Sequence, residues 1–506
     1  MMRGKARRAL AGVLLLVLGA ILTFVPARRY VGRRYVADTG VCRVDLEVIS
    51  RKDFRDGSEP GSVVLFHGLS GNKVVMNYLA RAFAEQGLRV YVPDLPGHGR
   101  STGPFTPEQA ESCALSLLRG LAARGLLLPD RTVIAGHSMG GAIALRVAGR
   151  FRPAGVIAIS PAPMREAHGV TAEKLLFHSV PPMPPSTLIM TGQLEPKWMT
   201  ENAADLVAGS GNASVEYKGV PLNSHVSLLF SPTVAREAQA WAARALQLPM
   251  ATRLPTRGGL LGGLLGLVGI LMLAGPFIWE ATGKEEVEER RAVGAPSWPR
   301  AALELAAASI GSMVVLRYWI PLKAMHSFEG DYLASFFLLV GLAVLFLHGS
   351  LARGQFRAKG TALLGAALAG FLLHLLLTGW LQLTLTGAWA TRERWIRFPF
   401  YFMGAFLFLF VLEVLVGPVT AGQLARRFAV WIAMVVVAWL ALAAGVMFFH
   451  SGEILLVLLS PYFAVLFVCM GLGAQLVRRL TGAATAAALF GAILLAGICQ
   501  VIFPIG

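Results

Sequence analysis

The feature that most constrains this fold is a set of long apolar spans, too many to be buried together inside a water-soluble globule. Eight lie in the second half of the chain, each about 20 residues long. In lipid, only a helix or a closed barrel satisfies every backbone polar group, and spans of this length fit helices. We therefore expect 258–506 to be an all-α transmembrane domain. The expected spans are 258–279, 302–321, 332–351, 361–386, 398–418, 428–449, 454–474 and 482–503.

A ninth apolar span, at 9–26, follows a basic start and carries no charge. This pattern fits either a cleavable signal peptide or a retained membrane helix. Arg28 and Arg29 follow directly, and basic residues at that place hinder export and cleavage. Residues 1–36 are therefore expected to form an N-terminal transmembrane anchor, with a signal peptide as the alternative.

Basic residues in the short loops predict the orientation in the membrane. If all nine spans cross and the N-terminus is cytoplasmic, the inner pieces hold 15 Lys and Arg and the opposite short loops hold 4. Cytoplasmic loops are usually the richer in these residues. We therefore expect a multi-pass protein of a bacterial-type plasma membrane with residues 37–248 outside the cytoplasm. The inner residues fall within 3–8, 284–300, 353–359, 426–427 and 478–479, and the outer ones are Lys323, Arg392, Arg394 and Arg397.

The segment between the first two spans has the composition of a globular domain. In 37–248, strand signals and helix signals alternate, which predicts an α/β fold with a mostly parallel, doubly wound sheet. Residues 162–185 form a short lid between two expected strands, and the Pro- and Arg-containing stretch 249–257 links the domain to the apolar spans.

One stretch of this segment predicts a catalytic nucleophile. A β-branched run ends in Gly136-His137-Ser138-Met139-Gly140, and a helix pattern of small residues follows. A Gly-x-Ser-x-Gly sequence between a strand and a helix is typical of a sharp turn that exposes a reactive serine. Ser138 is the expected nucleophile; its alternative role is an ordinary helix N-cap.

Residues on either side of this turn supply the remaining parts in a consistent order. The apolar run 62–66 leads into Leu69, whose N–H, together with that of Met139, is expected to form an oxyanion hole. Glu195 follows another apolar run, and His225 lies before the last helix pattern. We expect His225 to be the general base and Glu195 to orient it, with Asp94 or Glu201 as alternative acids.

Three motifs together resemble the monoacylglycerol-lipase-like group of α/β-hydrolases, over roughly residues 40–247. They are His67-Gly68, the Asp94-Leu95-Pro96-Gly97-His98-Gly99-Arg100-Ser101 segment, and the turn at Ser138. The resemblance implies an α/β-hydrolase fold and a serine hydrolase activity. The chain differs from the group in two features: its acid is Glu195 where the group usually has Asp, and its lid is short.

The expected function is that of a membrane-anchored serine hydrolase that cleaves carboxylic esters of lipid or acyl substrates through an acyl-enzyme. The same residues could serve an acyltransferase, a thioesterase or a peptidase, and the whole chain could be a transport or scaffold protein with an accessory hydrolase domain. The sequence contains no motif for a cofactor, metal or nucleic acid. The expected partners are the substrate and the bilayer; the oligomeric state is open.

A few other residues carry weaker expectations. His98 is expected to fix its turn by hydrogen bonds. His374 and Glu413 fall inside apolar spans, where hydrogen bonding between helices or a neutral buried state is expected in preference to a transport or catalytic role. The four cysteines, Cys42, Cys113, Cys469 and Cys499, are widely spaced and suggest neither a disulfide framework nor a zinc site.

Overall fold

The computed structural model describes residues 2–506 apart from 55–56, 58, 169, 173–174, 212–213, 283–295, 320–324, 357, 419–422 and 450–452. The expected loop cations Lys284, Arg290, Arg291, Lys323 and Arg357 lie outside the described residues, as do the side chains of Arg3 and Lys5. The chain divides into two compact units, each assembled from segments distant in sequence. One unit comprises 19–264, 381–389 and 504–506; the other comprises 1–18, 265–380 and 390–503.

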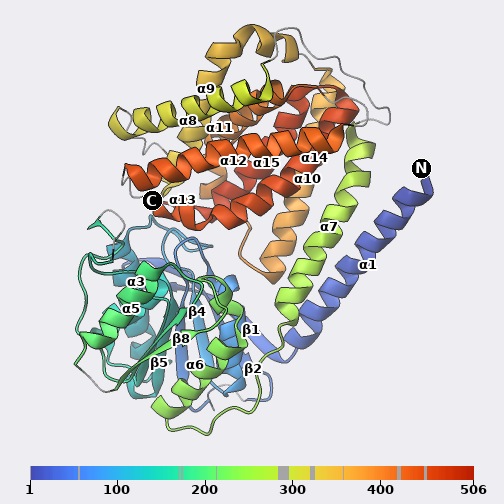
Figure 1. Cartoon of the computed structure of the whole chain (residues 1–506). Coiled ribbons are helices and arrows are strands. Elements are labelled where there is room, and N and C mark those ends of the chain that lie inside the picture. Colours follow the sequence, from blue (N-terminus) through green and yellow to red (C-terminus); the bar gives the residue numbers. More distant parts are fainter. Residues whose placement is uncertain are drawn as a thin grey trace. The chain divides into compact units, whose positions relative to one another are not determined.

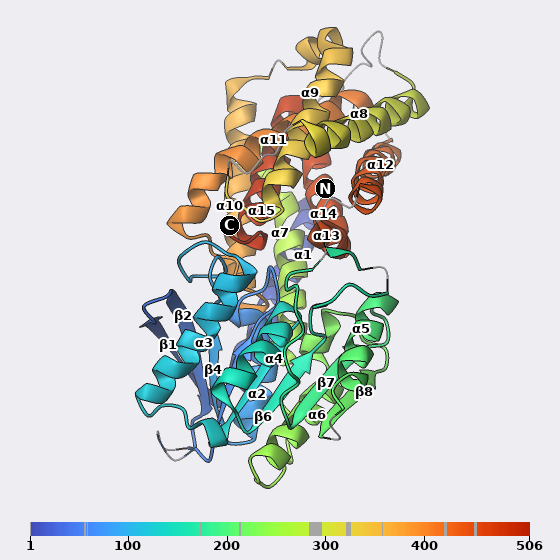
Figure 2. The same cartoon turned by 90° about the vertical axis from the view of Figure 1, so that its left-hand side faces the viewer.

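The first unit is built on one eight-stranded sheet with the order β1-β2-β4-β3-β5-β6-β7-β8 (Figures 1 and 2). Only β2 runs antiparallel to its neighbours; the pairs from β4 to β8 are all parallel. The strands are β1 (Tyr30–Asp38), β2 (Arg43–Arg51), β3 (Ser62–Phe66), β4 (Arg89–Pro93), β5 (Thr132–His137), β6 (Gly155–Ile159), β7 (Thr187–Gly192) and β8 (Val215–Val220).

Helices cover both faces of this sheet. One face packs against α2 (Asn77–Glu85) and α6 (Pro232–Ala245) in a continuous apolar core. The other carries α3 (Pro107–Ala123), α4 (Met139–Phe151) and α5 (Lys197–Ala208). β5 and β6 are buried along their whole length, as expected for strands enclosed by helices on both faces. The predicted α/β class, with a mostly parallel sheet, is confirmed.

The second unit is all-helical, as predicted. Nine helices in the described part of the chain are long and apolar enough to cross a membrane. The first falls within α1 (Met2–Ala27). The others are α7 (Gly258–Thr282), α8 (Trp298–Tyr318), α9 (Gly330–Gln355), α10 (Gly360–Thr384), α11 (Arg392–Val416), α12 (Leu424–Phe448), α14 (Ser460–Thr481) and α15 (Ala484–Ile502), with a short α13 (Ile454–Leu458) before α14.

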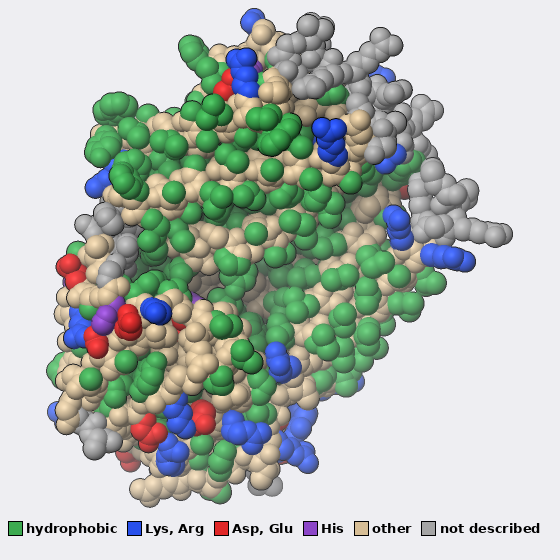
Figure 3. Space-filling model, in the orientation of Figure 1, with side chains coloured by type: hydrophobic (Ala, Val, Ile, Leu, Met, Phe, Trp, Pro, Cys, Tyr) green, Lys and Arg blue, Asp and Glu red, His purple; other side chains and the backbone are tan. Residues whose placement is uncertain are grey.

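The outer faces of these helices are apolar. Phe346 and Phe448 are 90% and 78% exposed, and α1 exposes a row of Leu, Val and Ile side chains. Figure 3 shows apolar side chains over the visible face of the long helices, whereas charged side chains gather over the sheet unit. Apolar surface of this extent on a monomer is typical of contact with a membrane or a protein partner.

Glycines bring α1 and α7 into close contact, and the two helices run side by side in Figure 1. A Cβ at Gly12 would lie 2.9 Å from the carbonyl oxygen of Gly269, and one at Gly262 would clash with that of Gly19. Small residues at such positions let helix backbones approach closely in membranes. The glycine-rich start of α7 therefore serves helix packing, as its sequence predicts.

Several buried polar groups in the helical unit pair with one another or with backbone, whereas His374 Nδ1 has no hydrogen-bond partner in the described part of the chain. Arg427 Nη2 donates to Glu413 Oε2 at 2.7 Å, so Glu413 has the interhelical partner expected for it. The Arg394 guanidinium donates to the carbonyls of Gln500 and Phe503 at the end of α15. An arginine near a helix C-terminus satisfies carbonyls that lack an intrahelical partner. Arg394 lies in the first turn of α11, so this contact gives it a structural role within the helical unit.

One expectation about the cysteines is wrong. Cys42 and Cys113 form a disulfide, with their Cα atoms 5.8 Å apart. Cys42 lies in the turn between β1 and β2, and Cys113 lies in α3, 71 residues further along. The pairing depends on how the fold brings that turn to α3, so the spacing in sequence gave no sign of it. Cys469 and Cys499 are free.

Candidate active site

The turn between β5 and α4 holds Ser138 in a strained backbone conformation, with φ at 54° and ψ at −120°. A residue other than glycine rarely adopts positive φ, and such strain persists only where the surrounding structure enforces it. The enforcing contacts are backbone hydrogen bonds on both sides. Ser138 N donates to Ile159 O at 2.9 Å, and Ser138 O accepts from Ala142 N and Ala162 N at 3.0 Å.

The flanking glycines of this turn are required by close backbone approach. A Cβ at Gly136 would clash with the carbonyl of Gly140, and a Cβ at Gly140 would lie 2.6 Å from the carbonyl oxygen of His67. The turn is therefore packed directly against the end of β3. Only glycine leaves enough space at either position, which explains the Gly-x-Ser-x-Gly spacing.

Glu195 and His225 lie together although 30 residues separate them. His225 Nδ1 donates to Glu195 Oε1 at 2.6 Å, and the Glu195 side chain is fully buried. Gly192 N donates to the second carboxylate oxygen, Oε2, at 2.6 Å. Glu195 follows β7 and His225 follows β8, so both stand beyond the carboxyl ends of parallel strands, where open α/β sheets place their ligand groups.

Ser160 is part of this cluster, and the sequence reasoning missed it. Its hydroxyl donates to Glu195 Oε1 at 2.5 Å and lies 2.9 Å from His225 Nδ1. It is fully buried, directly follows β6 and has a φ of 46°. Its sequence signal is only its position directly after an expected strand, and a single serine there has no distinguishing neighbour.

The imidazole of His225 is also anchored through its own backbone. His137 Nε2 donates to the carbonyl of His225 at 2.8 Å, and the two rings lie 4.6 Å apart. Burial lowers the pKa of His137 well below its usual range, so this neighbour is neutral. In the described part of the chain, no hydrogen bond joins Ser138 to His225. Catalytic hydrogen bonds are often long without substrate and tighten only when it binds.

The two alternative acids lie elsewhere. Asp94 accepts from the Lys73 N–H at 2.7 Å and pairs with the Lys73 ammonium. Glu201 Oε2 is 3.5 Å from His168 Nδ1 on the surface of the unit. Of the three candidate acids, only Glu195 therefore contacts His225.

The loop that carries Leu69 lies close to the turn that carries Ser138. A Cβ at Gly68 would lie 3.0 Å from Cβ of Ser138, so the loop after β3 approaches the serine closely. In the described part of the chain, neither the Leu69 nor the Met139 N–H has a hydrogen-bond partner. Met139 begins α4, and N–H groups in the first turn of a helix are available to an anion.

His67 orients the peptide that carries the Leu69 N–H. Its Nδ1 donates to Gly68 O at 2.8 Å, and its Nε2 accepts from Leu95 N at 2.9 Å. Gly71 N donates to the same Gly68 carbonyl at 2.9 Å. The carbonyl of Gly68 and the N–H of Leu69 belong to one planar peptide group, so fixing the first fixes the second. Burial lowers the pKa of His67, which favours the neutral imidazole with its proton on Nδ1.

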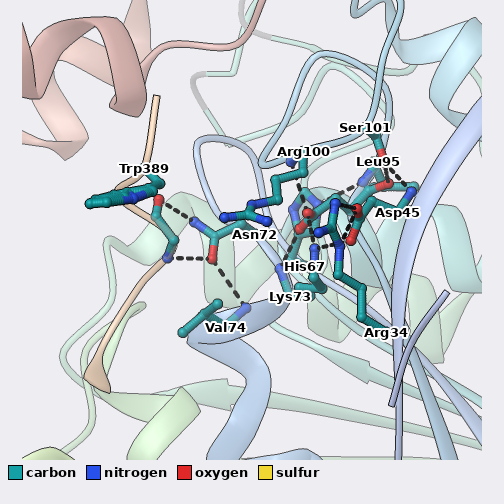
Figure 4. Close-up of polar contacts among 12 residues, drawn as sticks. Arg34, Asp45, His67, Asn72, Lys73, Val74, Leu95, Arg100, Ser101 and Trp389 are labelled. Carbon is teal, nitrogen blue, oxygen red and sulfur yellow. Dashed lines mark hydrogen bonds and ion pairs between the residues drawn. The ribbon is translucent and has the colours of Figure 1, made fainter. Parts of the chain in front are cut away.

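An ionic network with buried carboxylates lies beneath this loop (Figure 4). The Lys73 ammonium bridges Asp94 and Asp45, at 2.7 Å from Asp45 Oδ1, and Arg34 Nε donates to Asp45 Oδ2 at 2.7 Å. Burial opposes ionisation of Asp45, but the bonds from Arg34 and Lys73 outweigh it and hold its pKa below the usual range. Paired charges of this kind fix geometry more than they add stability.

Hydrogen bonds join the segment from Asp94 to Ser101 to this network. Asp94 Oδ2 accepts from Arg100 N at 2.9 Å, and Ser101 Oγ donates to Asp94 O at 2.6 Å. His98 donates through Nδ1 to Pro96 O at 2.8 Å and accepts at Nε2 from Ser70 N at 3.3 Å. The expectation that His98 fixes its turn is confirmed, and its ring also reaches the loop that carries Leu69.

The described residues hold no group of three or more His, Cys, Asp or Glu side chains that could bind a metal ion. The arrangement offers a strained serine, a histidine held by a buried carboxylate, and the N–H groups of Leu69 and Met139, which have no hydrogen-bond partner among the described residues. These are the parts that acyl transfer through a serine nucleophile requires.

Comparison with known proteins agrees with this geometry. Residues 61–249 match the sequence model of the family described as alpha/beta hydrolase fold. The chain is 34% identical over 98 residues to esterase YjfP of Escherichia coli, covering 17% of this chain and 39% of the esterase. It is 30% identical over 177 residues to monoacylglycerol lipase of Mycolicibacterium smegmatis, covering 34% of this chain and 60% of the lipase. The chain thus spans less than two thirds of either relative.

Among solved structures, the chain is similar to XC6422 of Xanthomonas campestris, described as a serine hydrolase without a lid. The two are 21% identical with a TM-score of 0.35, and the match covers 43% of this chain and 95% of the other. The sheet order and the match to the family model support the fold assignment. Residues 61–249 therefore form an alpha/beta hydrolase domain, in a chain that also carries a region of long apolar helices.

Proposed function

We propose that this protein is a membrane-embedded serine hydrolase that cleaves carboxylic esters. The observation that carries the proposal is the pairing of a strained Ser138 with the His225–Glu195 cluster at the carboxyl edge of one sheet. His225 removes the proton of Ser138 as its oxygen attacks the ester carbonyl and then gives that proton to the leaving alcohol. Water releases the acyl group in a second round. The Leu69 and Met139 N–H groups bind the oxyanion in both rounds.

Lipid esters are the proposed substrate class, because the hydrolase segment is tethered to apolar helices at both ends. It begins directly after α1 and ends shortly before α7. A site held at the bilayer meets lipid at high effective concentration. The relatives named as an esterase and a monoacylglycerol lipase support ester chemistry of this kind.

One feature of the structure supports placing the hydrolase segment outside the cytoplasm. The Cys42–Cys113 disulfide is typical of an oxidising compartment. The contacts of Asn72 with Gly387 and of Gly97 with Ile505 also require those residues to share one side of the membrane. Four apolar helices separate 257 from 387, and four more separate 387 from 505, so an even number of crossings satisfies this requirement. These contacts fit a bundle in which all eight helices cross but do not choose a side. The disulfide and the loop charges favour an extracytoplasmic hydrolase.

A fluorophosphonate probe tests the reaction. Membranes with the wild-type protein should be labelled and should hydrolyse p-nitrophenyl butyrate. Ser138→Ala should lose the label and lower kcat by about 10⁴ or more. Ser179→Ala, at an exposed serine of the same unit, is the matched control and should behave as wild type. Labelling of the Ser138→Ala protein would refute the assignment.

Placement and substrate can be tested separately. A cysteine introduced at the exposed Ala208 should react with an impermeant maleimide in intact cells, whereas one at Gly354 should react only after lysis. The reverse pattern would refute the orientation. In vesicles, the protein should hydrolyse monoacylglycerol in its own bilayer faster than the same lipid supplied in separate vesicles. Equal rates would remove the argument for a lipid substrate.

A further inference from the structure

The loop that carries the proposed oxyanion N–H is held by a segment more than 300 residues away. Asn72 lies three residues after Leu69 and is 5% exposed. Its Nδ2 donates to Thr386 Oγ1 at 2.9 Å and to Gly387 O at 3.2 Å, and its Oδ1 accepts from Gly387 N at 2.7 Å. The side-chain amide thus pairs with both backbone groups of Gly387, and Figure 4 shows Asn72 between that segment and the ionic network.

The same side chain also fixes its own loop. Asn72 Oδ1 accepts from Val74 N at 3.1 Å and so caps the turn of 3₁₀ helix at Lys73–Met76. The next residue, Lys73, is tied to Asp94 through its N–H and its ammonium. A shift of Asn72 would therefore reach Leu69 on one side and the ionic network on the other. The loop from Gly68 to Asn72 is restrained at its start by His67, in its middle by His98 and at its end by Gly387.

A second remote segment holds the neighbouring loop. Ile505 N donates to Gly97 O at 3.0 Å, and Ile505 O accepts from Phe105 N at 2.5 Å. Gly97 has a φ of 72°, and a Cβ there would lie 2.5 Å from Ile505 O. His98, the next residue, accepts from Ser70 N and packs edge-on against Phe105 at 5.0 Å. Ile505 therefore restrains the turn whose histidine contacts the oxyanion loop.

We propose that Asn72, Gly387 and Ile505 are positioning residues for the oxyanion hole, so that turnover depends on the segments that follow α10 and α15. The inference rests on the proposed function and adds to it. The sequence predicts that residues 37–248 contain every part that ester cleavage needs. The contacts assign two further parts to the segments 381–389 and 504–506, which belong to the same compact unit as the sheet.

The physical reason is the geometric demand on oxyanion donors. Loss of one donor costs about 10²–10³ in kcat, and a displacement of about 1 Å can cost about 10². The Leu69 N–H is stabilising only if its peptide stays aimed at the developing charge. Release of Asn72 would leave His67 and His98 to hold the loop, so the loss should be partial and should appear in kcat.

Gly387→Ala in the full chain tests the inference, because a Cβ there would lie 2.9 Å from Cγ of Asn72. Gly379→Ala is the matched control, since a Cβ at that position of α10 meets nothing within 4 Å. We expect Gly387→Ala to lower kcat for p-nitrophenyl butyrate by about 10-fold to 100-fold with KM within about twofold. The pH profile should keep its wild-type shape because the contacts of His225 are untouched. Gly379→Ala should match wild type.

Asn72→Asp is the second variant, and it covers the case in which Gly387→Ala fails to fold. The carboxylate keeps the acceptor for Val74 N and Gly387 N, but it loses the donor bonds to 386–387 and places an anionic oxygen against the Gly387 carbonyl, so we expect a comparable fall in kcat with the same unchanged KM. The inference is overturned if Gly387→Ala, or Asn72→Asp in its place, folds with an unchanged kcat or changes KM alone. Ser138→Ala distinguishes a failure of the proposed function from a failure of the positioning role. Turnover by Ser138→Ala would refute the proposed function. If Ser138→Ala is inactive but Gly387→Ala has the wild-type kcat, only the positioning role is refuted.

Discussion

The two sides of the candidate site are held together in different ways. On the side of the nucleophile, Ser138, Glu195 and His225 contact one another or strand ends of the sheet, within residues 137–225. On the oxyanion side, the loops around Leu69 and His98 are restrained by Gly387 and Ile505 as well. The first side is local to the hydrolase segment, and the second includes chain that lies beyond the apolar helices. The bond-making groups and the groups that stabilise charge can therefore be perturbed independently.

The largest loss of turnover is expected from substitutions on the nucleophile side. His225→Ala should cost as much as loss of Ser138, because the two act as a unit. Glu195→Gln should lower kcat by about 10³–10⁴, since an amide cannot hold the imidazole tautomer in the same way. Steady-state turnover of a short ester measures both.

The surface residue Glu201 provides the control for the acid, and Glu201→Gln should keep wild-type turnover. Near wild-type activity of Glu195→Gln beside an inactive, folded Asp94→Asn would show that Asp94 is the acid and that the nucleophile side is not local.

The sequence predicted the nucleophile side better than the oxyanion side, because the contacts of the nucleophile side are local to the hydrolase segment. Ser138, Glu195 and His225 each follow a strand signal, and the order of the strands brings their ends to one edge, so a linear pattern contains most of that information. Ser160 was missed because a single serine after a strand has no distinguishing neighbour. It acquires its importance only when β6 lies beside β7 and brings Glu195 within 2.5 Å.

Contacts that depend on distant closure were not predictable from the sequence. Asn72 and Gly387 are 315 residues apart, and neither belongs to a motif. The Cys42–Cys113 disulfide was missed for the same reason, because widely spaced cysteines predict no pairing until the hairpin of β1 and β2 is placed against α3. By contrast, every long apolar helix was predictable, because its hydropathy is a property of a continuous stretch.

Removal of the Cys42–Cys113 disulfide should have the next largest effect, and this effect is on the stability of the oxyanion side. Cys42 precedes Asp45 by three residues, and Asp45 is part of the network under that loop. Cys42→Ser with Cys113→Ser should lower the free energy of unfolding of the hydrolase unit by about 2–4 kcal/mol, because the bond closes a long loop. Urea unfolding in detergent, followed by loss of fluorophosphonate labelling, measures the change.

Thiol counting supplies the control for that prediction. The denatured wild-type protein should react with two equivalents of maleimide without reductant, at Cys469 and Cys499, and with four after reduction. Four equivalents without reductant would show that the bond does not form in the cell and would remove its support for an extracytoplasmic hydrolase.

A tenfold fall in kcat is expected from substitution of Ser160, which tests how Glu195 is held on the nucleophile side. Ser160→Ala removes a hydrogen bond to the Glu195 carboxylate, and bonds to charged groups contribute about 1.5–3 kcal/mol. We expect kcat to fall about tenfold. Ser160→Gly tests whether the hydroxyl or the backbone is responsible, because glycine tolerates the φ of 46° that alanine does not. If the glycine variant regains full activity, the hydroxyl has no positioning role.

The smallest effect is expected at Ile505, where a substitution can remove one backbone hydrogen bond to the loop beside the site. Ile505→Pro deletes the N–H that donates to Gly97 O, whereas Ile505→Val keeps it and preserves an apolar side chain. A single neutral hydrogen bond contributes about 0.5–1.5 kcal/mol, and His98 transmits only part of that restraint to Ser70. We therefore expect kcat to fall about threefold in the proline variant, with KM and the fraction of protein labelled by the fluorophosphonate unchanged from Ile505→Val. An Ile505→Pro protein with the kcat of Ile505→Val would confine the remote restraint to Gly387, and the oxyanion side would then depend on one distant segment rather than two.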